Sequence, residues 1–209
     1  MAATSVQAIA HPRIPGLFIY YDYLDSVGEQ TLIDYIMSQP WPVLLAPGGA
    51  PMKRKTQHYG YYYSYSAKST SEVAPPITGP LEVIRKNLAD TLGRPFNQII
   101  INLYERNQGI SAHIDKLDYG DLIITISLAA DTIMTFSRDG VEVNIYLPRR
   151  SMVIMSGDAR YKWYHAISDK ISPAYLPVAD ASDPRYAGKT APRDADCRRI
   201  SITVRHKPT

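Results

Sequence analysis

Apolar residues recur at helical spacing in two places in the first half of the chain. Within residues 26–38 they stand three or four positions apart, and Ser26 precedes Glu29 at the spacing of a capping box. A second series covers residues 81–92, and Pro80 stands where it suits the first turn of a helix. We therefore expect two helices in this half of the chain.

Short runs of β-branched and other apolar residues replace the helical pattern after Gly93. Turn-forming residues, such as those at 138–140 and 156–158, separate these runs. Helices followed by many short strands indicate an α+β, mainly β fold whose C-terminal part is a sandwich or jelly roll. The expected strands are Gln98–Tyr104, Leu122–Leu128, Thr132–Phe136, Val141–Leu147, Ser151–Met155 and Arg199–Arg205.

The chain of 209 residues has the length of one domain. We expect residues 1–95 to hold the helices and residues 96–209 to form the strand-rich part. Prolines and glycines in residues 39–56 predict a loop, and the polar, proline-rich residues 178–197 predict a long one. Long loops in compact domains are often functional.

Composition excludes several classes of protein. The single cysteine, Cys197, excludes an intramolecular disulfide and favours a reducing, intracellular compartment. We expect neither a signal peptide nor a membrane span, because no apolar run is long enough. The net charge of +3 permits an anionic partner without requiring one. The chain is expected to be a monomer.

His113-Ile114-Asp115 is the first candidate for chemistry. Alternate residues of an extended strand point to the same side, so this imidazole and carboxylate converge. His165 follows a strand and a turn and is the candidate third ligand. Two histidines and one carboxylate leave one face of an octahedral iron open, as in non-haem Fe(II) oxygenases. Taken alone, an H-x-D tripeptide is a weak signal, and a lone histidine is more often structural.

The last expected strand carries two arginines on one face. Arg199, Ser201, Thr203 and Arg205 alternate with apolar residues and therefore point the same way. Arginines on an otherwise core-like strand are costly without anionic partners, and a dicarboxylate offers two. The alternative is an edge strand whose arginines are solvated.

Together with their surroundings, these residues resemble the AlkB family of 2-oxoglutarate oxygenases. The motifs occur in the family's order between residues 98 and 205. They are N-x-Y (Asn102, Tyr104), H-x-D (His113, Asp115), a Ser-Leu strand (Ser127, Leu128), G-[DE]-x-R with a following Tyr-His (Gly157, Asp158, Arg160, Tyr164, His165) and R-x-[NS]-x-T-x-R (Arg199, Ser201, Thr203, Arg205).

The resemblance implies a double-stranded β-helix, a jelly-roll variant, with an N-terminal lid. It implies Fe(II) held by His113, Asp115 and His165, with 2-oxoglutarate and O2 as co-substrates. Arg199 would bind the C5 carboxylate of 2-oxoglutarate and Arg205 would lie near its C1 carboxylate. The other co-substrate residues would be Asn102, Tyr104, Ser201 and Thr203.

Two departures from the family pattern concern the substrate. Ser201 stands where the founding bacterial member has asparagine, and Ala129 replaces a common glycine. Residues 147–151 and 157–165 are more similar to the branch of the tRNA wobble-uridine hydroxylase than to the DNA-repair branch. The chain has neither the RNA-recognition motif nor the methyltransferase domain of that animal enzyme.

Residues 53–65 combine cations with tyrosines and are the candidate substrate lid. Cations hold phosphates, and aromatic faces stack on bases that have been taken out of a duplex. The alternative is a tyrosine ladder packed on the core beside a solvated basic loop. The candidate substrate residues are Lys53, Arg54, Lys55, His58, Tyr59, Tyr61 and Tyr63, and Tyr65 would continue the same face.

Three functions remain to be compared. The first is an oxygenase that hydroxylates or demethylates modified bases in RNA, tRNA or DNA, with release of succinate and CO2. The second is a 2-oxoglutarate oxygenase acting on protein, and the third is a non-catalytic binding module on the same fold. The intact ligand set argues against the third. Steep salt dependence of binding would favour nucleic acid over protein.

Overall fold

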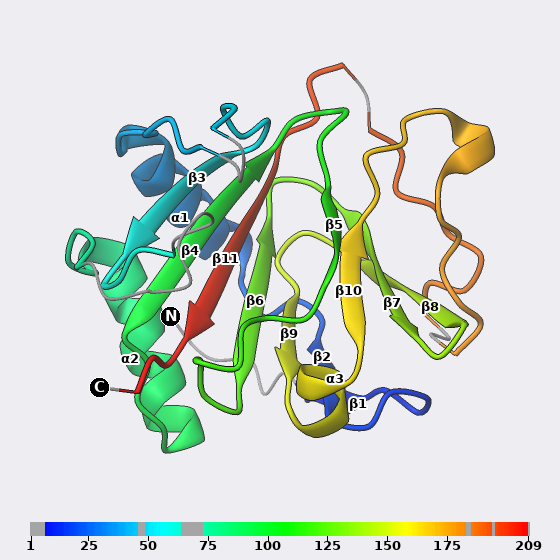
Figure 1. Cartoon of the computed structure of the whole chain (residues 1–209), viewed down its shortest axis with the longest axis horizontal. Coiled ribbons are helices and arrows are strands. Elements are labelled where there is room, and N and C mark those ends of the chain that lie inside the picture. Colours follow the sequence, from blue (N-terminus) through cyan, green and yellow to red (C-terminus); the bar gives the residue numbers. More distant parts are fainter. Residues whose placement is uncertain (1–6, 46–48, 64–72, 183–184, 194, 209) are drawn as a thin grey trace.

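The expected strands pair into two antiparallel sheets in the computed structural model, which describes residues 7–45, 49–63, 73–182, 185–193 and 195–208. The large sheet has the order β1-β2-β9-β6-β11-β4-β3, and the small sheet has the order β5-β10-β7-β8 (Figure 1). The strands are β1 Ile9–Ala10, β2 Leu17–Tyr20, β3 Lys55–Tyr59, β4 Gln98–Tyr104, β5 Ile110–His113, β6 Ile123–Leu128, β7 Thr132–Arg138, β8 Val141–Leu147, β9 Met152–Met155, β10 Tyr164–Ile167 and β11 Arg199–Arg205.

All six expected strands are present, and β4, β8 and β11 have the expected bounds. The strands that the sequence did not reveal, β1, β2, β5 and β10, contain two to four residues each. Such short segments do not show a period of two clearly enough to be recognised. The expected mainly β fold is confirmed.

Both expected helices form, as α1 (Ser26–Ser38) and α2 (Gly79–Leu92), and a short α3 (Gly157–Tyr161) and a 3₁₀ turn (Pro173–Tyr175) are added. Helices α1 and α2 cover one face of the large sheet (Figure 1). Their buried residues, such as Leu32 and Leu88, form a core with Ile202 of β11. A second core between the two sheets includes Ile123 of β6 and Phe136 of β7.

Helix α1 has the expected bounds, but the residue that caps it differs from the capping-box prediction. Asp25 is the N-cap, and its side chain accepts a hydrogen bond from the Gly28 backbone N–H at 2.6 Å. The predicted pairing of Ser26 with Glu29 is therefore wrong. Glu29 is only 1% exposed and its carboxylate accepts from Arg149 Nε at 2.9 and 3.0 Å and from the Ala129 N–H at 2.9 Å. This carboxylate fastens α1 to the turn between β8 and β9.

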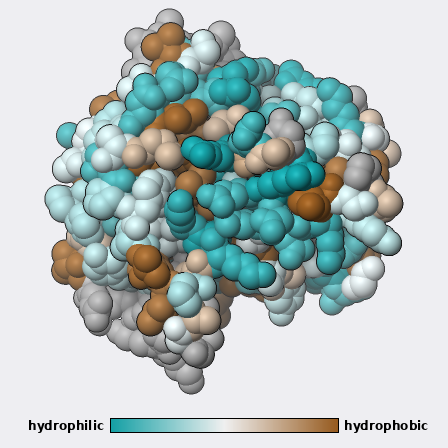
Figure 2. Space-filling model, turned by 90° about the horizontal axis from the view of Figure 1, so that it is seen from above, coloured by the Kyte–Doolittle hydropathy of each residue, from teal (hydrophilic) through white to brown (hydrophobic). Residues whose placement is uncertain are grey.

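The described residues of 178–197 contain neither helix nor strand, as the long-loop prediction requires. They cover the outer face of the small sheet, where Tyr186 stacks on Tyr146 with ring centroids 4.7 Å apart. The face at the top of the view in Figure 1 is largely hydrophilic, with apolar residues in small separate patches (Figure 2). Within the described residues, no helix has the length and apolar character needed to cross a membrane.

The buried Glu29 predicts a measurable loss of stability. Glu29→Ala leaves the guanidinium of Arg149 and the Ala129 N–H without their acceptor, so the free energy of unfolding should fall by about 1.5–3 kcal/mol. Glu82→Ala is the matched control, because Glu82 also pairs with two cations, Arg85 and Lys86, but at the surface of α2. That change should cost below about 1 kcal/mol. Urea unfolding of both variants decides the point, and equal losses would contradict it.

Candidate metal centre and its pocket

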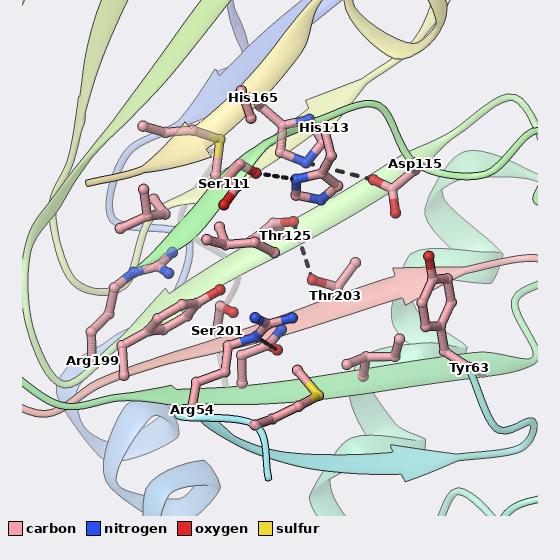
Figure 3. A pocket seen from close by; sticks show the side chains of 18 of the residues that line it. Arg54, Tyr63, Ser111, His113, Asp115, Thr125, His165, Arg199, Ser201 and Thr203 are labelled. Atoms are coloured by element: carbon pink, nitrogen blue, oxygen red, sulfur yellow. Dashed lines mark hydrogen bonds and ion pairs between the residues drawn. The ribbon is translucent and has the colours of Figure 1, made fainter. Parts of the chain in front are cut away.

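The H-x-D pair and the distant histidine meet at one point. One ligand atom from each of His113, Asp115 and His165 lies within 4.8 Å of the others. His165 Nε2 is 3.7 Å from Asp115 Oδ2, and the two imidazole rings have centroids 4.3 Å apart. Figure 3 shows the three side chains turned toward one another on the wall of a pocket. The spacing and the donor types suit a single divalent transition-metal ion.

Pairing between β5 and β10 sets the positions of the two histidines. His113 and His165 are direct partners in this antiparallel pair, and Asp115 follows two residues after the end of β5. His113 Nδ1 lies 2.8 Å from the Ser111 carbonyl oxygen. Because a carbonyl can only accept, Nδ1 carries the proton and Nε2 is left as the metal ligand.

Asp115 is held by an arginine from the other sheet. Arg205 Nη1 donates to Asp115 Oδ1 at 2.5 Å, and both side chains are largely buried. Burial works to raise the pKa of Asp115, but the charges of Arg205 and the neighbouring cationic groups lower it on balance. Burial lowers the pKa of His165 to about 4. At neutral pH the carboxylate is therefore ionised and the His165 imidazole is neutral, which are the forms that bind a metal.

Arg160 fixes the backbone around Asp115. This side chain is 2% exposed and donates to the carbonyls of Asp115 (2.9 Å), Lys116 (2.5 Å), Tyr119 (3.4 Å) and Gly120 (3.3 Å). The arginine of the G-[DE]-x-R motif thus shapes the segment that follows the H-x-D pair.

A cavity of about 530 Å³ extends from the metal ligands along β11. The four polar residues of β11 all line it, which confirms that they share one face and excludes the solvated-edge alternative, since β11 lies between β6 and β4. Apolar side chains of Ile110, Met134 and Ile167 line the opposite side. The lining further includes Asn102, Tyr104, Thr125, Arg199, Ser201, Thr203 and Arg205.

Arg199 lies at the end of the cavity away from the metal ligands, which we call the Arg199 end (Figure 3). Its side chain is 1% exposed, its Nη2 donates to Ser127 Oγ at 2.9 Å, and it lies over the Tyr104 ring. Burial lowers the pKa of Arg199 to about 10, so it stays charged at neutral pH. Within the described chain its Nε has no hydrogen-bond partner and it makes no ion pair. A carboxylate in the cavity would accept a hydrogen bond from Nε and balance the charge of the guanidinium.

The candidate lid is divided by the structure. Strand β3 covers only Lys55–Tyr59, and Gly60, at φ +79°, turns the chain away, so the prediction that Tyr59, Tyr61 and Tyr63 share one face is wrong. Tyr59 packs in the core under the helices, as the ladder alternative expected. Tyr63 and Arg54 line the cavity. Tyr65 lies outside the described residues.

The remaining lid residues have different surroundings. His58 is buried, and burial together with Arg205 and Arg54 lowers its pKa to about 4, so it supplies no positive charge at neutral pH. Its Nδ1 accepts from the Tyr63 N–H at 3.2 Å. Lys53 and Lys55 are exposed, and Tyr61 is half-buried beside Lys207.

Several residues of the site had no signal in the sequence. Gln98 is fully buried and binds both Arg205 Nε (3.0 Å) and the Tyr61 carbonyl (2.9 Å). Thr125 and Met134 line the cavity from β6 and β7. Only Arg160 could have been noticed, because it belongs to a recognised motif, but its burial depends on contacts about 40 residues away in the chain.

Facing antiparallel sheets that hold two histidines and a carboxylate beside a buried arginine define a non-haem iron oxygenase. The family model of the 2OG-Fe(II) oxygenase superfamily matches residues 21–205, and the chain belongs to that superfamily as an AlkB-type member that uses Fe(II), 2-oxoglutarate and O2.

Similarity to known proteins covers most of the chain. It is 30% identical to the Xenopus tropicalis tRNA (carboxymethyluridine(34)-5-O)-methyltransferase alkbh8 over 97% of its own length. It is 29% identical to the Arabidopsis thaliana alkylated DNA repair protein ALKBH8 homolog over 74% of its length. The chain spans 34% of the first relative and 51% of the second. The solved structure of OsALKBH1 has the same fold, with a TM-score of 0.62 at 16% identity, covering 92% of this chain and 98% of that one.

The triad predicts that metal binding depends on each ligand. His113→Ala should reduce the affinity for Mn(II), used as a redox-inert probe, by at least 10-fold and abolish turnover, because two ligands remain. His206→Ala is the control, since His206 is another half-buried histidine, outside the triad. Titration calorimetry with Mn(II) measures the affinity, and circular dichroism checks the fold. Unchanged Mn(II) affinity in His113→Ala would remove this residue from the metal site.

Proposed function

We propose that this oxygenase oxidises a modified base in nucleic acid, and that Arg199 and Arg205 determine how 2-oxoglutarate lies in the cavity. The observation that carries the co-substrate part is the buried guanidinium of Arg199, which faces a polar cavity ending at the metal ligands. A dicarboxylate that chelates the metal at one end needs a cation at the other, and Arg199 supplies it.

Each co-substrate residue has a separate task. Arg199 would bind the C5 carboxylate, and the hydroxyls of Tyr104 and Ser127 keep its side chain in place. Arg205 neutralises Asp115 and would lie near the C1 carboxylate. Asn102, Ser201 and Thr203 line the floor between the two ends, where small polar groups leave room for the co-substrate.

Bound Fe(II), with 2-oxoglutarate and O2, supplies an oxidant that hydroxylates a C–H bond while succinate and CO2 are released. The protein itself orients the reactants and excludes water. The apolar wall of Ile110, Met134 and Ile167 limits solvent near the ligands. On an N-methyl group the hydroxylated product loses formaldehyde, and on a carbon substituent the hydroxyl group remains.

Nucleic acid as the substrate is supported by two independent features. Tyrosines and basic residues lie beside the cavity, and such pairs stack on bases and hold phosphates. The names of both relatives refer to nucleic acid, a tRNA uridine in one and alkylated DNA in the other. The greater similarity to the tRNA-directed relative favours RNA, and a modified uridine is the first base to test.

The Arg199 assignment predicts a defect specific to 2-oxoglutarate. Arg199→Ala leaves the C5 carboxylate without its cation, which costs on the order of 2–5 kcal/mol, so the KM for 2-oxoglutarate should rise strongly. Arg199→Lys should restore it only in part, because a point charge cannot make the paired contact. Steady-state succinate formation measures both, with Mn(II) affinity as a check that the metal site is intact. An unchanged KM would remove Arg199 from the co-substrate site.

The substrate class can be tested directly. Succinate release should increase with a modified RNA oligonucleotide, above the basal release seen with 2-oxoglutarate alone, and should decline as salt is raised. The comparison set is the same sequence unmodified, a methylated single-stranded DNA and a methylated peptide. Stimulation by the peptide alone would replace nucleic acid by protein as the substrate and leave the oxygenase assignment intact.

A further inference from the structure

The end of the cavity that holds the metal ligands, which we call the metal end, is close to two tyrosine–lysine pairs, and Tyr63 of one pair lines the cavity itself. Lys116 Nζ is 4.8 Å from the centre of the Tyr63 ring, and Lys207 Nζ is 4.6 Å from the centre of the Tyr61 ring. Both tyrosines follow the turn at Gly60, and all four side chains are half-buried. Each pair therefore presents an aromatic face and a positive charge together.

The backbone that carries these pairs is fastened to the metal ligands. Gln98 binds the Tyr61 carbonyl at 2.9 Å and Arg205 Nε at 3.0 Å, and Arg205 in turn holds Asp115. Lys207 is fixed by two hydrogen bonds with the side chain of Asn97, each 2.7 Å long. The position of the pairs relative to the metal is therefore set by buried hydrogen bonds.

The cations of the basic run lie elsewhere. In the pairing of β3 with β4, Lys55 stands opposite Leu103 and Tyr59 opposite Ile99, so Lys55 lies toward the Arg199 end. Lys55 Nζ is 3.9 Å from Glu105 Oε1. Figure 3 shows Arg54 toward the Arg199 side of the pocket and Tyr63 toward the side of Asp115. The basic run and the half-buried tyrosines thus lie toward opposite ends of the cavity.

We infer that a single nucleic-acid strand binds at the metal end, with its bases on Tyr61 and Tyr63 and its phosphates on Lys116 and Lys207. This inference rests on the proposed function and adds the path of the strand. A stacked base and its own phosphate need an aromatic face and a cation side by side, which each pair provides. Tyr63 lines the same cavity as the metal ligands, so a base on Tyr63 would be held at the mouth of that cavity.

The salt dependence of binding tests this path. The full chain, loaded with Mn(II) and 2-oxoglutarate, is titrated with a fluorescent single-stranded RNA at several salt concentrations. Lys116→Ala/Lys207→Ala should lower the slope of log Kd against log salt by about 1.4, at about 0.7 per phosphate contact. Arg160 donates a hydrogen bond to the backbone carbonyl of residue 116, and this carbonyl is still present in the alanine variant. The substitution should therefore leave the backbone of this segment in place.

A charge-matched control separates local contact from net charge. Lys86→Ala/Lys189→Ala also removes two positive charges. Lys189 likewise lies over a tyrosine ring, because its Nζ is 5.1 Å from the centre of the Tyr186 ring, in the loop that covers the small sheet. This double variant should leave the slope unchanged. Tyr61→Ala and Tyr63→Ala should weaken binding with little change in slope, whereas the phenylalanine variants should keep the affinity. Melting temperatures of all variants identify any that are misfolded.

Three results would overturn the inference. Equal slope changes in both lysine pairs would mean a general attraction to positive charge. A larger change in Lys53→Ala/Lys55→Ala would place the strand at the Arg199 end. If the protein without substitutions binds neither RNA nor DNA, nucleic acid is not the substrate. That result would contradict the proposed function itself, and it is seen before any variant is made.

Discussion

The ion pair between Arg205 and Asp115 is the contact on which the site depends. It joins β11 of the large sheet to the segment after β5 of the small sheet, and the two residues are 90 positions apart in the sequence. The pair keeps Asp115 ionised in a buried position, and through Gln98 it also fixes the backbone of Tyr61. One buried guanidinium thus sets the charge of a metal ligand and the place of the surface beside it.

Strand β11 separates two environments by the alternation of its side chains. Ile200, Ile202 and Val204 pack toward the helices, while the arginines and the small hydroxyl residues face the cavity. The large sheet therefore needs α1 and α2 on its outer face, because the side chains on that face are apolar and must be covered from water. The Glu29 contact, which holds α1 in place, supports the site from the opposite side of the sheet.

The sequence was sufficient to predict those features of the site that depend on residues close together in the chain. The bounds of β11 and the shared face of Arg199 and Arg205 followed from a period of two, and the metal ligands followed from a motif reinforced by its neighbours. It was insufficient where a partner lies far away in the chain. Glu29 had the spacing of a capping box, yet its partner is Arg149, and Gly60 interrupted a tyrosine pattern that looked continuous. Neither outcome can be derived from local propensity, because long-range contacts decide both.

The place of β11 has a consequence for how the enzyme is assembled. It is the last strand along the chain, yet it lies between β4 and β6 in the middle of the large sheet. Until it inserts, those two strands have unpaired edges and Asp115 lacks Arg205 as its counter-ion, so the charge balance of the metal site is completed only when the large sheet closes.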